Sequence, residues 1–162
     1  MATLLPLLRA APLAASTASL MHATGELAMN SAFLDPSIRE LSDQVLPTWF
    51  SHVFHRLVWV VVGLKSVTIA TTVGNIVVGG AGRRWYWVGL AGAVGHLMFV
   101  PWVAGPVGRI VGGGRGGEKG DKRDKGEATR EMERWLSVHR VRMVVADLPG
   151  WLGCLMAVVT GS

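Results

Sequence analysis

Cysteine is almost missing from this chain, because Cys154 is the single one among 162 residues. One thiol cannot form an intrachain disulfide, and it cannot supply a cysteine cluster for a metal ion. Apolar residues surround Cys154 in the sequence, so we expect it to be a small apolar side chain inside the last helix. The sequence therefore excludes a fold held together by disulfides and a metal centre built from cysteines.

Charged residues are also scarce. They make up 17% of the chain, whereas 50% is hydrophobic and the mean hydropathy is +0.38. A soluble protein contains about 25% charged residues, so this composition favours lipid as the solvent. The formal net charge of +5 would suit nucleic acid, but the basic residues flank apolar segments or alternate with acidic residues in one loop. We therefore predict an integral membrane protein that contacts the lipid bilayer and no nucleic acid.

The long apolar segments set the predicted fold. We expect an all-α, four-helix transmembrane bundle in which residues 1–162 form a single integral membrane domain. A helix needs about 20 residues to cross a bilayer. The helices are expected at about residues 10–34, 49–78, 85–103 and 138–160, with a kink at Pro149-Gly150. Residues 108–130 are charged, rich in glycine and without apolar periodicity, which predicts a flexible loop.

Small residues recur at helical spacing in two of these segments. Ala11, Ala15, Ser19 and Ala23 lie four residues apart in the first, and Gly89 and Ala93 lie four apart in the third. Small side chains let helix backbones approach closely in a membrane. Both segments are therefore expected to pack against neighbouring helices along these faces.

The basic residues are divided unequally between the two ends of such a bundle. The connections at residues 35–48 and 108–134 share one end and hold most of the arginine and lysine. The other end, with both termini, holds only Arg9, Arg83 and Arg84. By the positive-inside rule the long loop is cytoplasmic. The termini are then lumenal, in the endoplasmic reticulum or another endomembrane.

Polar side chains inside the apolar segments form the candidate site. When the helices alternate in direction, all 5 histidines fall in one leaflet and every helix supplies at least one. Buried ionisable residues in a membrane are costly and usually mark function. The candidates are His22, Glu26, His52, His55, Arg56, His96, His139, Arg142 and Asp147. Lys65, near the midplane, is expected either to snorkel or to pair with Glu26 or Asp147.

Several histidines with a glutamate could bind zinc, iron or copper. The patterns His-Glu-x-x-His and Glu-x-x-His are missing, and one His-x-x-His pair remains, His52 and His55. We therefore predict no bound metal.

Four short motifs resemble a known family. They are Arg9-x-x-Pro12, Pro47-x-Trp49-Phe50, Val100-Pro101 with Gly105-Pro106, and Trp135-x-x-x-His139-x-x-Arg142. In these motifs, and over most of its length except the charged loop, the chain resembles the small four-helix membrane proteins of the anthrone oxygenase-like family of fungal and bacterial polyketide pathways. The resemblance implies oxidation of an anthrone to an anthraquinone by O2 without flavin, haem or known metal.

The resemblance also suggests roles for the candidate residues. A neutral histidine would remove a proton from the activated methylene, and an arginine would stabilise the resulting oxyanion. The predicted base is His55 or His139, and the predicted oxyanion partner is Arg142 or Arg56. The predicted supporting residues are His22, Glu26, His52, His96 and Asp147. Trp49 or Trp135 would stack on the substrate, a hydrophobic aromatic small molecule, with O2 as co-substrate and no cofactor.

Two other classes of function fit the same helices. In a non-catalytic scaffold, interaction or small transport protein, the polar residues would only hold the helices together. A cyclase or isomerase could use the same fold for chemistry without O2. No internal repeat is visible in the sequence, which disfavours a transporter built from inverted repeats. The sequence leaves substrate identity and oligomeric state open.

Overall fold

The computed structural model describes residues 4–112 and 125–161, and within these ranges the chain forms helices and turns without a β-strand. The α-helices are α1 (Leu4–Ser31), α2 (Arg39–Val78), α3 (Arg83–Met98), α4 (Val100–Gly112), α5 (Glu127–Arg142) and α6 (Leu148–Gly161). Short 3-10 turns occupy Ala32–Leu34 and Pro36–Ile38, and a π-helical turn, Met143–Asp147, joins α5 to α6. The predicted all-α class is confirmed.

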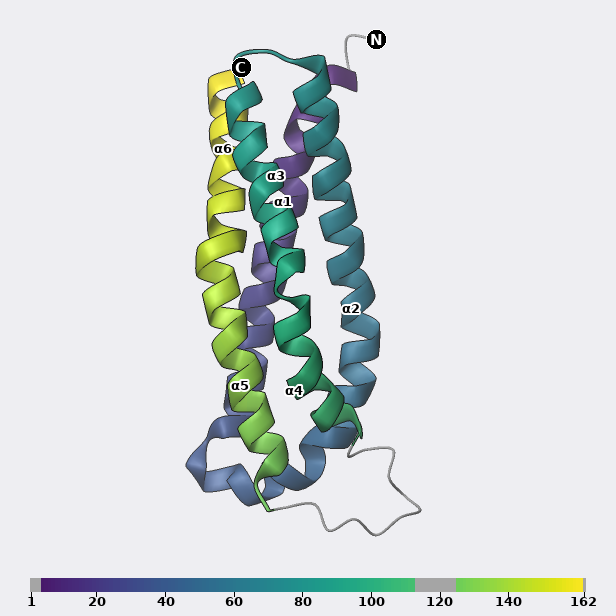
Figure 1. Cartoon of the computed structure of the whole chain (residues 1–162), viewed down its shortest axis with the longest axis vertical. Helices are drawn as coiled ribbons and strands as arrows, with labels where there is room; N and C mark the ends of the chain where they lie inside the picture. The colour runs from purple at the N-terminus through teal and green to yellow at the C-terminus, as the bar shows by residue number, and fades with distance from the viewer. Residues whose placement is uncertain (1–3, 113–124, 162) are drawn as a thin grey trace.

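The helices combine into four spans that stand side by side (Figure 1). The first span is α1, the second is α2, the third is α3 with α4, and the fourth is α5 with the π-helical turn and α6. Each is long and apolar enough to cross a membrane. Both ends of the chain and the α2–α3 connection lie at one end of the bundle (Figure 1). The predicted four-helix bundle is therefore confirmed, and its helices alternate in direction.

Several helices extend beyond their predicted limits. The first begins at Leu4, the second at Arg39 and the fourth at Glu127. The additional residues of α2 and α5 include many polar ones. They can be helical because the start of α2 packs against α4 and α5 through a buried apolar core. That core consists of Leu46, Phe50, Val107, Ile110, Ala128, Met132, Trp135 and Leu136. The predicted loop at 108–130 is correspondingly shorter, since residues 108–112 belong to α4 and 127–130 to α5; residues 113–124 lie outside the described ranges.

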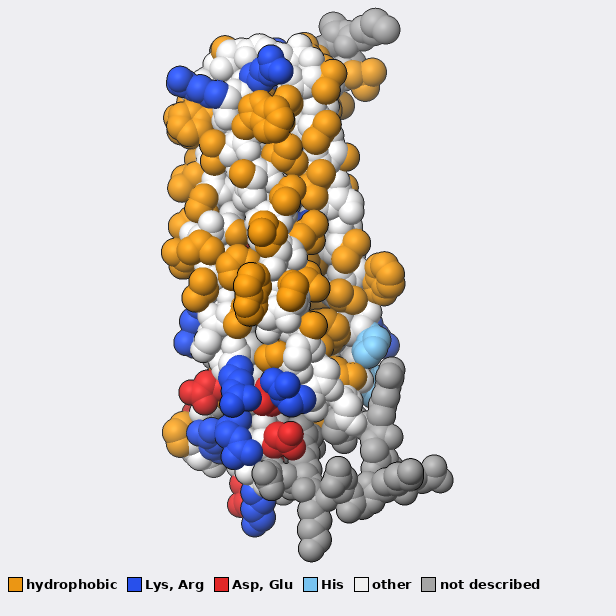
Figure 2. All heavy atoms as spheres, in the orientation of Figure 1, with side chains coloured by type: hydrophobic (Ala, Val, Ile, Leu, Met, Phe, Trp, Pro, Cys, Tyr) orange, Lys and Arg blue, Asp and Glu red, His pale blue; other side chains and the backbone are white. Residues whose placement is uncertain are grey.

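The outer surface of the bundle is apolar, as expected for contact with lipid. Figure 2 shows hydrophobic side chains along the length of the molecule, with charged side chains gathered toward its ends. Trp59, Val77 and Val144 are 73%, 80% and 64% exposed. Water would penalise such exposure, whereas lipid does not. The surface thus agrees with the four apolar spans.

Pro12 lies inside α1 and leaves a backbone carbonyl without its usual partner. Proline has no N–H, so the Leu8 carbonyl four residues earlier cannot accept its helical hydrogen bond. Asn75 of α2 replaces the missing donor, with Nδ2 2.7 Å from the Leu8 oxygen. The Tyr86 hydroxyl of α3 donates to the next carbonyl, that of Arg9, at 3.0 Å. Asn75 of α2 therefore satisfies the interrupted carbonyl, and Tyr86 adds a hydrogen bond between α3 and the next residue of α1.

Asp43 of α2 starts α5 from outside that helix. Its carboxylate accepts hydrogen bonds from the backbone N–H groups of Gly126, Ala128 and Thr129 at 2.8, 2.8 and 3.2 Å. The first N–H groups of a helix have no partner within it, so a carboxylate here both accepts these bonds and complements the helix dipole. The second and fourth spans are thereby joined at this end of the bundle.

Glycines allow α3 and α6 to pack with their backbones nearly touching. A Cβ atom added at Gly92 would lie 2.4 Å from the Gly150 Cα and 2.7 Å from the Ala146 carbonyl oxygen. A Cβ at Gly153 would lie 2.7 Å from the Gly89 nitrogen. The small-residue face predicted on the third helix is therefore a helix contact, and so is that of the first helix, where Ala15, Ser19 and Ala23 are buried.

This contact predicts how Gly92→Ala behaves. The added methyl group would force α3 and α6 apart, at a cost of about 1–3 kcal/mol in stability. The loss of stability is measured as a fall in the thermal unfolding midpoint of the detergent-purified protein. Gly95→Ala is the matched control on the same helix, because its Cβ would meet only the Ala146 Cβ at 3.6 Å, an ordinary contact. Equal midpoints for the two variants would contradict the close α3–α6 packing.

Candidate functional site

The bundle interior holds ionisable side chains from every span. This polar cluster consists of His22 and Glu26 of α1, Lys65 of α2, His96 of α3, His139 and Arg142 of α5, and Asp147 of the π-helical turn. At about 1.5 Å per residue, Lys65 and Asp147 lie about 20 Å from the end of the bundle that holds both termini. That depth is near the middle of an apolar core about 30 Å thick.

Asp147 is the centre of the cluster. Its Oδ1 accepts hydrogen bonds from Lys65 Nζ and from His96 Nδ1, each at 2.7 Å. Its Oδ2 lies 3.4 Å from Arg142 Nε, and its side chain is only 2% exposed. A buried carboxylate needs such partners, because lipid and protein solvate a charge far less than water does. Of the alternatives for Lys65, the structure selects the pairing with Asp147.

The π-helical turn explains how Arg142 and Asp147 come to face each other. Residues five apart point in different directions on an α-helix, but they stack on the wider π-helical turn. The Leu148 N–H donates to the Met143 carbonyl, which is the π-type hydrogen bond five residues back. Pro149, two residues after Asp147, cannot donate to the Val145 carbonyl, so the helical ladder is interrupted at this place. A π-helical turn therefore lies just ahead of Pro149, where the sequence predicts a kink.

His139 is fully buried and uses both ring nitrogens within the protein. Nε2 lies 2.9 Å from the Ala23 carbonyl oxygen of α1, and Nδ1 lies 2.9 Å from Arg142 Nη2. A carbonyl can only accept and a guanidinium can only donate, so Nε2 carries the hydrogen and Nδ1 accepts. The Trp135 ring covers the imidazole at 4.9 Å between centroids. In this arrangement His139 positions Arg142 and has no ring nitrogen left for a substrate proton.

His96 has a different arrangement. Its Nδ1 contacts the Asp147 carboxylate, which can only accept, so Nδ1 carries the hydrogen. The hydrogen bonds of the described residues engage His96 through Nδ1 and not through Nε2. A carboxylate that holds one ring nitrogen protonated and leaves the other as an acceptor is the arrangement of a histidine general base. Sequence reasoning placed His96 among the supporting residues, and only the Asp147 contact distinguishes it.

Arg142 and Asp147 also retain unused hydrogen-bonding capacity. Arg142 Nε and Asp147 Oδ2 are buried without a hydrogen-bond partner, although they lie 3.4 Å apart within ion-pair range. A cavity of about 10 Å³ lies beside Lys65 and Asp147, between α2, α3 and the fourth span. A water molecule needs a cavity of about 10–15 Å³. The cluster thus offers a donor and an acceptor but no room for a large molecule.

His22 and Glu26 form the edge of the cluster on α1. His22 Nε2 lies 3.4 Å from Glu26 Oε1, and the two side chains are 18% and 14% exposed. Glu26 is close enough to Arg142 and Asp147 for their charges to interact. Glu26 therefore adds a second carboxylate at the edge of the cluster, on the side of α1.

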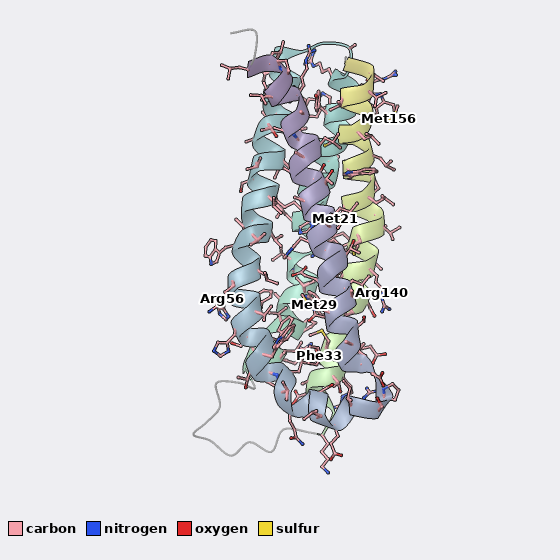
Figure 3. The ribbon with its side chains drawn as sticks, turned by 180° about the vertical axis from the view of Figure 1, so that it is seen from behind. Met21, Met29, Phe33, Arg56, Arg140 and Met156 are labelled. Carbon is pink, nitrogen blue, oxygen red and sulfur yellow. The ribbon has the colours of Figure 1, made fainter. Side chains whose placement is uncertain are left out.

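The residues predicted at the start of the second span lie elsewhere. His52, His55 and Arg56 are exposed, and the two histidines bond through Nδ1 to carbonyls of their own helix, those of Thr48 and Ser51. Figure 3 shows Arg56 pointing away from the bundle. α2 turns these side chains outward because its inner face at this level carries Leu46 and Phe50. The structure does not bring His55 and Arg56 to the polar cluster, and their catalytic role stays a prediction.

The two tryptophans predicted to stack on a substrate contact other protein rings. Trp49 packs on Phe33 at 4.8 Å between centroids, and Trp135 packs edge-on against Phe50 at 5.7 Å. Both rings contribute to the apolar core at the charged end of the bundle, Trp135 from its buried centre and Trp49 from its edge. Substrate stacking on either ring stays untested.

No set of three or more histidine, cysteine, aspartate or glutamate side chains is arranged to hold a metal ion within residues 4–112 and 125–161. The polar cluster comes closest to such a set of ligands, but there His96 and Asp147 bond to each other and Lys65 adds a positive charge beside them. The prediction of a site without metal or cofactor stays a prediction.

Proteins similar to this chain over nearly its whole length occur in fungi. The probable epoxidase scpX of Mollisia scopiformis is 31% identical over 97% of this chain and 96% of its own length. Epoxidase gkaX of Penicillium citrinum is 30% identical over 99% and 98%, and epoxidase pydX of an Acremonium species is 31% identical over 91% and 90%. No family model matches the chain, and no solved structure matches it. The matching proteins bear the name epoxidase rather than anthrone oxygenase.

The central position of Asp147 predicts the effect of removing its charge. Asp147→Asn would leave Lys65 and Arg142 buried beside a neutral amide, and breaking a buried ion pair costs about 3–5 kcal/mol. We expect the amount of folded protein recovered in detergent and its unfolding midpoint to fall sharply. Arg140→Met is the control, because it removes an exposed charge from α5 that points away from the bundle (Figure 3). The double variant Lys65→Met/Asp147→Leu should recover part of the lost yield, and no difference between the single variants would contradict this account.

Proposed function

The chain belongs to the family of the fungal epoxidases scpX, gkaX and pydX, and from this premise we propose that it oxygenates a hydrophobic, unsaturated small molecule inside a membrane. The product would carry an epoxide in place of a carbon–carbon double bond, as part of fungal secondary metabolism. The observation that carries this proposal is the polar cluster, where all four spans bring ionisable side chains to one place in an apolar bundle. A scaffold or interaction protein would need no such costly arrangement.

A reaction with O2 and no cofactor can be balanced if the substrate itself supplies the electrons. A base removes a proton from an activated C–H bond, and the carbanion adds to O2 to give a hydroperoxide after reprotonation. The hydroperoxide then passes its outer oxygen atom to a neighbouring double bond. The products are an epoxide and an alcohol, so both atoms of O2 are retained in the product. Each protein group needs only to move a proton or to stabilise a negative oxygen.

We assign the base to His96. Asp147 holds its Nδ1–H at 2.7 Å, which orients the ring and stabilises the imidazolium that forms when Nε2 takes a proton. His139 is less suited, because Ala23 and Arg142 occupy both of its nitrogens. This proposal keeps a histidine as the base, as the sequence predicts, and gives the role to His96 in place of His55 or His139.

Arg142 suits the stabilisation of the oxyanion. Its Nε is buried and carries a hydrogen without a partner, while His139 fixes the far end of the guanidinium at 2.9 Å. A donor that is already oriented and desolvated stabilises developing negative charge more than a mobile donor in water would. His139, Glu26 and Lys65 would act through Arg142 and Asp147 as positioning residues.

Oxidation of an anthrone is a second candidate with the same first steps. The motif Trp135-x-x-x-His139-x-x-Arg142 that carries that resemblance does form a contact unit, with the Trp135 and His139 rings 4.9 Å apart and Arg142 bonded to His139 at 2.9 Å. An anthrone hydroperoxide would lose water to give the quinone, with no double bond to epoxidise. The two candidates therefore differ in the substrate and in the fate of the hydroperoxide.

The function is tested with membranes that contain the protein, incubated with a conjugated polyene or with an anthrone under isotopically labelled O2. We expect the labelled oxygen to appear in the epoxide and the alcohol of the polyene product. His96→Ala should lower the rate per amount of folded protein by about 100- to 10,000-fold, the usual effect of losing a general base. Added imidazole should restore part of that rate, because it can replace the missing base.

The matched control is His55→Ala, which removes an exposed histidine and should leave the rate close to that of the unchanged protein. Conversion of the anthrone alone would select the second candidate. If His55→Ala is inactive and His96→Ala is active, the base is His55 of the second span. Loss of activity on treatment with a chelator would contradict the cofactor-free reaction.

For localisation we propose the endoplasmic reticulum or another endomembrane, with both termini lumenal. The charged end of the bundle, which holds Arg39, Arg109 and Arg130 among others, would then face the cytosol. Protease added to sealed microsomes should cut between α4 and α5 and should spare a tag placed after α6. Removal of the tag with that connection intact would reverse the orientation.

A further inference from the structure

An apolar groove of about 300 Å³ opens on the lipid-facing side of the bundle. It lies where α3 passes into α4, beside α5 (Figure 1), and its lining residues are Phe99, Trp102, Ser137, Val138 and Val141. Trp102 and Val141 are 62% and 52% exposed. The groove therefore opens to the surrounding bilayer and not only to the interior of the helix bundle.

A break in the third span forms one wall of this groove. The Phe99 N–H donates to the His96 carbonyl at 3.2 Å, and the Trp102 N–H donates to the Phe99 carbonyl at 3.1 Å, which are both bonds three residues back. This tighter turn separates α3 from α4 ahead of Pro101. Phe99 and Trp102 then pack on each other at 5.6 Å between centroids. The result is an aromatic wall opposite the valines of α5.

The same helical turns carry the groove and the proposed site. Phe99 lies one turn after His96 on the third span. Val138 and Val141 directly precede His139 and Arg142 on α5. The groove and the polar cluster thus occupy the same depth of the bundle, on two of the same spans. A molecule in the groove would lie against the helices that hold the proposed base and the proposed oxyanion donor.

The apolar groove and the cavity in the polar cluster differ greatly in volume. The cavity beside Lys65 and Asp147 measures about 10 Å³, enough for about one water molecule. The groove, at about 300 Å³, reaches the lower end of the range for small-molecule sites, about 300–1,000 Å³. Two other spaces lie away from the cluster, one of about 480 Å³ beside Arg39 and Lys125 at the charged end of the bundle and one of about 270 Å³ by Arg9 and Gly161 at the opposite end. A substrate body therefore fits the groove and not the cluster itself.

We infer that the groove between Phe99, Trp102, Val138 and Val141 binds the apolar body of the substrate, which enters sideways from the bilayer. The ligand class is an elongated or flat unsaturated hydrocarbon skeleton, because aromatic and β-branched side chains line the groove and Ser137 supplies its one hydroxyl. The inference rests on the proposed function for the identity of the ligand as a substrate. Binding itself can be measured without any turnover.

The binding test uses an alkenyl diazirine, a photoreactive unsaturated hydrocarbon, with the full-length protein in lipid nanodiscs. Peptide mapping should place saturable labelling on the Phe99–Trp102 and Ser137–Val141 segments, and an unlabelled conjugated polyene should compete with it. Labelling of Val144, which faces lipid one turn further along and is 64% exposed, should rise linearly without saturation. Uniform, non-saturable labelling of both places would overturn the groove as a binding site.

The variants Val138→Trp and Val141→Trp fill the groove, and Val144→Trp is the matched control on the neighbouring lipid face. The first two should abolish saturable labelling and raise KM for the polyene by about tenfold or more with little change in kcat, because the pocket and not the chemistry is altered. Val144→Trp should change neither. Size-exclusion profiles in detergent show which variants are folded, and Val138→Ala, which enlarges the groove without adding bulk, should keep the saturable labelling.

The two proposals fail in different ways. Saturable labelling in a protein that oxygenates neither polyene nor anthrone would keep the groove and remove the proposed function. Oxygenation of the polyene with unchanged KM in folded Val138→Trp and Val141→Trp would keep the function and remove the groove.

Discussion

One buried carboxylate, that of Asp147, determines how the spans meet. Lys65 comes to it from α2, His96 from α3 and Arg142 from the other side of the π-helical turn, at 2.7, 2.7 and 3.4 Å. In an apolar bundle surrounded by lipid, little water can replace a lost partner, so each charge must find its opposite within the protein. This requirement fixes the rotation of the helices about their axes, which apolar contacts alone would leave loosely defined.

Packing and electrostatics depend on each other here. Gly92 brings α3 against Gly150 and the Ala146 carbonyl, and His96 lies one turn beyond Gly92 on the same helix. Without a side chain at position 92, α3 approaches the π-helical turn closely enough for the imidazole to reach Asp147. The π-helical turn in turn aligns Arg142 with the same carboxylate. A close backbone contact, a local change in helix type and a set of ion pairs are therefore parts of one arrangement.

The arrangement also separates the charged groups from the larger apolar space. The charged groups are packed together with room for about one water molecule, whereas the larger apolar space opens to lipid on the neighbouring face. In the proposed reaction the apolar body of the substrate would stay in the groove while its reacting carbon contacts His96 and Arg142, because a general base must lie within hydrogen-bond distance of the proton that it removes. His139 belongs to the polar side of this division, since one of its nitrogens orients Arg142 and the other ties α5 to α1.

The sequence alone determined the all-α class, the four spans and the need of Lys65 and Asp147 for partners inside the bundle. Helix length, apolar content and the energetic penalty of Lys65 and Asp147 in lipid act locally, so they can be derived from the order of residues. Which histidines share a site was decided by tertiary structure. His52 lies about one helical turn from Arg56, much as His139 lies about one turn from Arg142, yet the packing of Leu46 and Phe50 leaves His52 and His55 facing outward. The choice of Asp147 as the partner of Lys65 depended on the π-helical turn and on the approach of α3 to α6, because both change which faces meet, and neither can be derived from a regular 3.6-residue period.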